Sequence, residues 1–139
     1  AVNTIRLGGF VEHQCRLRKF GEALLHRLYK HPYVYQFKDV MKYFINNTDL
    51  SENVIPTVVS GWDHTPRSGR EALVFDRCTP DVFSKHVEDT FQLVNRKHNK
   101  MVFIRAWNEW AEGNHLEPDL KYGKGFLEAI KSNLIKYGN

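Results

Sequence analysis

The sequence is poor in cysteine and has no long apolar run. Its two cysteines, Cys15 and Cys78, fit neither the spacing of a metal site nor a disulfide framework. We therefore expect reduced cysteines and a cytoplasmic protein. No stretch approaches the roughly 18 apolar residues of a membrane span, and the segment that starts at Ala1 lacks the charged and apolar regions of a secretion signal. We therefore expect no membrane span.

Glycine-rich phosphate loops and basic blocks are also missing. Because no such loop follows an apolar run, nucleotide binding by the usual routes is unsupported, and we expect no cofactor. The formal net charge is +4, but the 20 lysines and arginines are scattered among 16 acidic residues. This scatter argues against a nucleic-acid partner, an alternative that predicts a steep salt dependence of DNA binding. One histidine, His115, and scattered acids such as Glu117 are weak evidence for a metal, so none is expected.

What the sequence does contain is helical periodicity. With 42% hydrophobic and 26% charged residues, the composition is that of a globular protein with one core. Apolar spacing predicts helices over residues 16–29, 37–44, a third that begins at the N-cap Thr79, and a last one near the C-terminal end. The side chains expected to face the core are Leu17, Phe20, Leu24, Leu25 and Leu28, then Phe37, Val40, Met41 and Phe44, then Phe83, Val87, Phe91 and Val94, and finally Phe126, Ile130 and Leu134.

Two apolar runs, over residues 54–59 and 101–106, predict strands. Strands that alternate with helices pair in parallel, so both are expected to be buried on two faces. Residues around Phe10 and Val11 offer a third strand, and residues 61–77 are expected to form one long loop, a length that is usually functional. The sequence therefore predicts an α/β fold.

The residues with chemical potential cluster after the second apolar run. Residues 107–113 (WNEWAEG) place two carboxylates and two indoles where a buried strand ends, which is where α/β folds hold their sites. Glycosidic chemistry usually needs a proton donor and a second carboxylate, about 5 to 10 Å apart. Glu109 and Glu112 fit that need, and their spacing admits both retaining and inverting geometries. The alternatives are two solvated glutamates and a core role for Trp107 or Trp110.

A second polar group follows the first apolar run. Trp62, Asp63 and Arg67 offer an indole face, a carboxylate and a guanidinium for a sugar ring, its hydroxyls and an anionic group. In the alternative, Asp63 and Arg67 pair with each other and stiffen the loop. The expected catalytic residues are Glu109 and Glu112, and the expected substrate-binding residues are Trp62, Asp63, Arg67, Trp107, Asn108, Trp110, His115 and Glu117.

These motifs resemble a known family. Residues 56–134, with GWDHTPR, TPDVF and WNEWAEGNHLEPDLKYGKGFLEAI, are similar to the C-terminal part of the WbsX-type proteins. These are a glycoside hydrolase family 99-like group often labelled as glycosyltransferases or lipopolysaccharide biosynthesis proteins. His64 stands where the family more often has asparagine, and residues 1–55 match only weakly. The resemblance implies that residues 1–139 are a single domain, the C-terminal portion of a longer (β/α)8 TIM-type barrel, whose open sheet edges invite self-association.

The resemblance also implies roles for the two glutamates. In related endo-acting α-mannosidases, an NEWxEG motif holds both catalytic carboxylates, which match Glu109 and Glu112. There Glu112 would be the acid/base, and Glu109 would deprotonate the sugar 2-hydroxyl, which retains configuration through a 1,2-anhydro sugar. We therefore expect a carbohydrate-active enzyme, glycosidase-like or a glycosyltransferase, acting on bacterial surface polysaccharide or lipopolysaccharide O-antigen. Its partner would be an oligosaccharide or polysaccharide. A non-catalytic glycan-binding module is the alternative.

Overall fold

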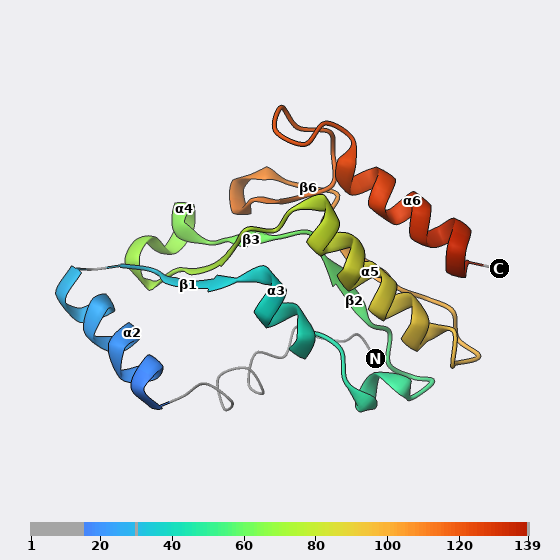
Figure 1. Cartoon of the computed structure of the whole chain (residues 1–139), viewed down its shortest axis with the longest axis horizontal. Coiled ribbons are helices and arrows are strands. Elements are labelled where there is room, and N and C mark those ends of the chain that lie inside the picture. Colours follow the sequence, from blue (N-terminus) through green and yellow to red (C-terminus); the bar gives the residue numbers. More distant parts are fainter. Residues whose placement is uncertain (1–15, 30, 139) are drawn as a thin grey trace.

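The computed structural model describes residues 16–29 and 31–138, which form an elongated body with helix α2 at one end (Figure 1). The strand expected around Phe10 and Val11 lies outside the described residues, as does Cys15. Cys78 is a free thiol, and burial raises its pKa. In the described part of the chain, every helix is too short or too polar to cross a membrane.

Helix α2 spans Arg16–Tyr29, as its spacing predicts, but it does not contribute to the core. It lies beside strand β1 (Tyr33–Gln36), where Tyr35 Oη donates to Glu22 Oε2 (3.0 Å) and the His26 ring stacks on Tyr33 (4.5 Å). The expected core role is wrong for the described members of its apolar stripe, since periodicity shows which face is apolar but not whether another element covers it. The exposed side chains are Phe20, Leu24, Leu25 and Leu28.

The segment expected to be one loop, residues 61–77, contains two strands. Strand β3 (Trp62–Asp63) pairs antiparallel with β4 (Leu73–Asp76), and β4 pairs parallel with β1, which gives the order β1-β4-β3. Helix α4 (Thr65–Ser68) and the 3-10 turn η3 (Gly69–Glu71) join them. The loop prediction was wrong because these strands are too short to give a pattern of their own.

The predicted parallel pairing of the two apolar runs is confirmed. Strand β2 (Thr57–Val59) pairs with β5 (Phe103–Arg105) in parallel, with Val58 opposite Ile104. All of β2 is buried, whereas every residue of β5 is exposed. The expectation that both strands are buried was therefore wrong for β5, because β2 is its one strand neighbour in the described part of the chain.

The second predicted helix is shorter and less regular than its pattern suggests. It consists of α3 (Phe37–Val40) followed by the 3-10 turn η1 (Met41–Tyr43). A further 3-10 turn, η2 (Asn47–Leu50), begins with a capping box in which the Asn46 side chain and Asp49 exchange hydrogen bonds with backbone amides. Two buried clusters form the core, one around Phe37, Phe44 and Phe75 and one around Val58, Phe83 and Phe126.

His86 joins the first cluster to strand β2. Its ring lies edge-on to Phe37 and Phe44, and Nε2 accepts the Val59 amide at 3.3 Å. The side chain is 1% exposed. Burial lowers the pKa of His86 to about 4, because desolvation disfavours the charged ring.

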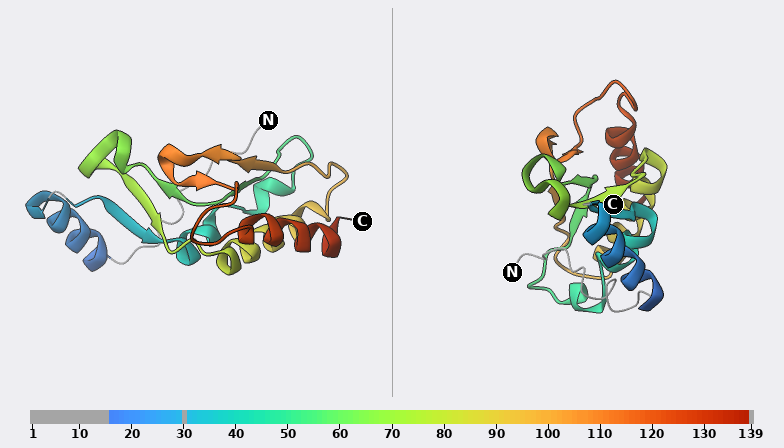
Figure 2. Two further views of the ribbon diagram at one scale, coloured as in Figure 1. Left: turned by 90° about the horizontal axis from the view of Figure 1, so that it is seen from above. Right: turned by 90° about the vertical axis from the view of Figure 1, so that its left-hand side faces the viewer.

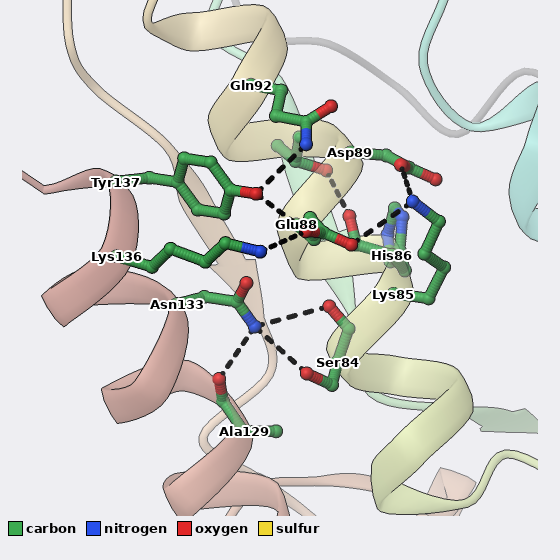
Figure 3. Close-up of polar contacts among 11 residues, drawn as sticks. Ser84, Lys85, His86, Glu88, Asp89, Gln92, Ala129, Asn133, Lys136 and Tyr137 are labelled. Carbon is green, nitrogen blue, oxygen red and sulfur yellow. Dashed lines mark hydrogen bonds and ion pairs between the residues drawn. The ribbon is translucent and has the colours of Figure 1, made fainter.

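Helices α5 (Pro80–Val94) and α6 (Gly125–Tyr137) pack side by side (Figure 3). Thr79 caps α5 as predicted, its hydroxyl accepting the Val82 amide at 3.4 Å. Asn133 Nδ2 donates to Ser84 Oγ (3.0 Å), and Glu88 binds Lys136 and Tyr137. On the apolar face of α6, Phe126 is buried and Ile130 half-buried, but Leu134 is exposed, so its expected core position was wrong.

Candidate functional site

The candidate site lies where the parallel strands β2 and β5 end. Because parallel strands end at the same edge of a sheet, the segments that follow them meet. One segment holds β3 and α4. The other forms a hairpin of β6 (Asn108–Glu109) and β7 (Asn114–His115) around the 3-10 turn η4 (Trp110–Glu112). Turn η4 contacts α4 (Figures 1 and 2).

One buried amide joins the two segments. Asn114 Oδ1 accepts hydrogen bonds from Ser60 Oγ (3.0 Å) and from the Ala106 amide (2.7 Å). Nearby, Gly61 has a φ of +129°, and a Cβ on it would lie 2.9 Å from the carbonyl oxygen of Gly113. Glycine is therefore required where the two backbones approach each other.

Glu112 is the buried carboxylate of the site, with 6% of its surface exposed. Arg67 Nε lies 2.8 Å from Glu112 Oε1, and His64 Nε2 lies 3.6 Å from the same oxygen. Ser68 Oγ lies 3.0 Å from His64 Nδ1 on the other side of the imidazole. The loop after β2 thus places a guanidinium and an imidazole beside a carboxylate supplied by the loop after β5, and the contact with Arg67 offsets part of the cost of burying that charge.

Glu109, the second predicted catalytic carboxylate, is half-buried at the end of β6. Its backbone pairs with Asn114, which fixes it in the same hairpin as Glu112. Asn108 is exposed, and Trp107 is 56% exposed while its carbonyl oxygen accepts the Leu116 amide at 2.9 Å. The structure therefore places the whole predicted motif in one hairpin, but buries only Glu112 deeply.

Trp62 and Asp63 form the other wall of the site. Arg105 Cζ lies 4.5 Å from the centre of the Trp62 ring, which stacks on His64 at 5.8 Å. Asp63 Oδ1 accepts from the Thr65 amide (2.9 Å) and hydroxyl (2.6 Å). Asp63 thus shapes the turn into α4, while Arg67 pairs with Glu112.

Trp110 belongs to a separate cluster at the tip of the hairpin. Its Nε1 donates to Glu117 Oε2 at 2.6 Å, and its ring stacks on His115 with centroids 3.7 Å apart. His115 Nε2 lies 3.4 Å from Asp119 Oδ2. Among the residues that the structure describes, no three His, Cys, Asp or Glu side chains are arranged to hold a metal ion.

The sequence reasoning missed Asn114, His64 and Arg105 as site residues. Asn114 gave no signal of its own, because a single amide carries no pattern before its burial is known. His64 lies between two residues that were selected, Asp63 and Arg67. Arg105 is the one charged residue of the apolar run 101–106. A polar residue that closes a strand was the signal for Arg105.

Comparison with known proteins places the chain in a family. Two uncharacterized proteins, both named WxcX and from two strains of Xanthomonas campestris pv. campestris, are 38% identical over 84 residues. The match covers 58% of this chain but only 12% of either relative. No solved structure matches the chain. The family model described as glycosyltransferase WbsX matches residues 6–130. The chain therefore belongs to the glycosyltransferase WbsX family.

Proposed function

We propose that the protein acts on glycosidic bonds of a bacterial surface polysaccharide or lipopolysaccharide O-antigen, with Glu109 and Glu112 at its centre. The observation that carries the proposal is the burial of Glu112 against Arg67 and His64, at the edge where β2 and β5 end. A buried carboxylate surrounded by donors from a second loop is costly to build for stability alone. Membership of the WbsX family supports a carbohydrate as substrate.

The two carboxylates divide the work in this proposal. In the substrate complex Glu112 separates from Arg67, takes up a proton and gives it to the leaving glycosidic oxygen. Glu109 takes the proton of the sugar 2-hydroxyl, which then attacks the anomeric carbon of the same ring. Arg67 and His64 hold Glu112 in place until substrate arrives. Water then opens the anhydro sugar in a hydrolase, whereas an acceptor sugar hydroxyl opens it in a transferase; in both, the ionised Glu112 takes the proton of the attacking oxygen. With a nucleotide-sugar donor, the group that leaves in the first step is the nucleoside diphosphate.

We also propose that the chain is the C-terminal portion of a (β/α)8 barrel. The supporting features are the parallel pair β2 and β5, the helix α5 between them in sequence, and the exposed residues of β5. Such a barrel would hold its site at the C-terminal ends of its strands, where Glu112 lies.

The test is turnover of O-antigen oligosaccharides by the longest protein that carries this sequence, with and without nucleotide-sugar donors. Glu112→Gln and Glu109→Gln should each lower the rate by about 10²- to 10⁴-fold, the usual contribution of an acid or base. Glu128→Gln, on the exposed side of α6, is the matched control. Full turnover by Glu112→Gln would contradict the assigned role, and product formed only with a donor identifies a transferase.

A glycan-binding module without catalysis is the second candidate function. The exposure of Trp107 and Trp110, 56% and 49%, favours it, because half-exposed indoles beside polar groups suit a sugar surface. This candidate predicts that oligosaccharides quench tryptophan fluorescence while their length stays unchanged after prolonged incubation. Product release that depends on Glu112 would exclude it.

A further inference from the structure

A cavity of about 700 Å³ lies beside the Glu112 site, lined by the Trp62 loop, the hairpin, and residues of the segments 74–79 and 119–126. The residues that line it include Trp62, Asp63, Trp110, His115 and Tyr122. Gly113, the neighbour of Glu112, lines the cavity. Glu112 and Arg67 are not among the described residues that line it. The volume falls in the range of ligand-binding pockets, about 300 to 1,000 Å³. The cavity is therefore adjacent to the proposed catalytic residues without containing them.

Trp110 is a fixed aromatic surface in this cavity. The hydrogen bond from Nε1 to Glu117 holds one edge of its indole, and the His115 ring covers one face at 3.7 Å with an angle of 15° between the planes. The side chain is nevertheless 49% exposed. An indole held in one orientation loses little conformational entropy when a ligand stacks on it.

Asp119 holds His115 in place. Its Nε2 lies 3.4 Å from Asp119 Oδ2, while Asp119 Oδ1 accepts the amides of Lys121 (2.7 Å) and Tyr122 (2.5 Å). Burial would raise the pKa of Asp119, but the amide hydrogen bonds outweigh it, so the pKa lies below its ordinary value. Asp119 is thus an anion that orients His115 beneath Trp110.

We propose that this cavity is a second sugar subsite, in which a neutral ring of the glycan stacks on Trp110. In this inference, which rests on the proposed function, His115, Asp119 and Glu117 are positioning residues that act through Trp110. The rim favours a neutral ring because acidic and basic side chains both line it, so neither sign of charge dominates. Its charged residues are Asp63, Asp76, Arg77, Asp119 and Lys121. Because the cavity and Glu112 lie side by side, the substrate spans at least two sugar units.

The first test measures how affinity depends on substrate length. Mannan-derived oligosaccharides of one to four units are titrated into the Glu112→Gln variant, which is used to prevent turnover, by calorimetry and tryptophan fluorescence. The disaccharide should bind at least tenfold more tightly than the monosaccharide. Adding Trp110→Ala should abolish that advantage and leave monosaccharide affinity unchanged. Trp110→Phe, which keeps an aromatic face, should retain part of it.

The positioning residues have a separate readout. The chain has three tryptophans, so its NMR spectrum gives three indole N–H signals, and Trp110→Phe identifies one of them. His115→Gln and Asp119→Asn should shift that signal and lower disaccharide affinity by about three- to tenfold. Asp81→Asn, an exposed residue in the first turn of α5, is the control and should do neither. A preserved global spectrum shows that each variant folds.

The outcomes separate this inference from the proposed function. Should the disaccharide keep its advantage in Trp110→Ala, the subsite is refuted, while turnover that depends on Glu112 still supports the function. An unchanged indole signal in Asp119→Asn would refute the positioning role. If no oligosaccharide is bound or turned over by the natural protein, the proposed function fails, and the subsite fails with it.

Discussion

Acid should destabilise this fold through one residue, His86. The imidazole is 1% exposed, accepts the Val59 amide through Nε2 and lies edge-on to two phenylalanines. Its pKa is about 4 in the folded chain and ordinarily 6.5. Between these values the unfolded chain binds a proton that the folded chain does not. The free energy of unfolding therefore falls as the pH is lowered from 6.5 towards 4.

The size of the effect follows from the two pKa values. One pKa unit corresponds to about 1.4 kcal/mol, so lowering the pKa of His86 from 6.5 to about 4 corresponds to about 3 to 4 kcal/mol, lost in full once the pH is below 4. That is a large part of the 5 to 15 kcal/mol by which domains are usually stable. Glu88 acts in the same direction at lower pH, because hydrogen bonds from Lys136, Tyr137 and Lys85 lower its pKa from 4.5 to about 2. The window from pH 6.5 to 5 therefore isolates the contribution of His86.

The assay is urea unfolding at half-unit steps from pH 7 to 4.5, on the wild type and on His86→Gln, whose amide oxygen can accept the Val59 amide. The wild type should lose up to about 1.4 kcal/mol per pH unit more than the variant below pH 6. An NMR titration of the His86 ring protons checks the pKa directly, even if the variant is unstable. Equal pH slopes for the two proteins, or a His86 ring that titrates near pH 6.5, would refute the reasoning.

Three substitutions test the packing that positions the site, each by urea unfolding at pH 7. Gly61→Ala should cost about 1 to 3 kcal/mol, because φ is +129° and the new Cβ would lie 2.9 Å from the Gly113 carbonyl oxygen; a neutral effect would contradict the close approach. Asn114→Ala should cost about 1 to 3 kcal/mol, because two donors lose their buried acceptor; the tie is unimportant if stability is unchanged. Asn133→Ala should cost a similar amount by weakening the contact between α5 and α6, whereas exposed Lys131→Ala should cost less than about 0.5 kcal/mol; equal losses would argue against this contact.

Local signals in the sequence were sufficient to predict the elements that depend on neighbours in the chain. The helix over residues 16–29 follows from apolar spacing, and the start of α5 follows from Thr79 and the proline after it. The parallel pairing of β2 and β5 follows from the helix between them. In contrast, β4 is a strand because β1 and β3 lie on either side of it, and four residues carry too little pattern to reveal that.

The two loops of the candidate site could be predicted from the sequence, but the contacts between them could not. Glu112 and Arg67 were each selected from their own motif, but neither motif indicates that the two side chains pair at 2.8 Å. The alternative partner for Arg67, Asp63, was closer in sequence but is used to form the turn at Thr65. The exposure of apolar side chains could not be predicted either. The position of a residue such as Leu134 shows which face of the helix is apolar but not whether another element packs on it.

The hydrogen bonds of Asn114 have a mechanical consequence. Because a single oxygen atom accepts from both Ser60 and Ala106, the ends of β2 and β5 are tied to each other. A ligand that displaces the Trp62 loop would pull the hairpin with it, and that hairpin carries both glutamates and Trp110. The two loops are therefore linked through Asn114, and substitutions in either loop should alter the ligand contacts that the other loop makes.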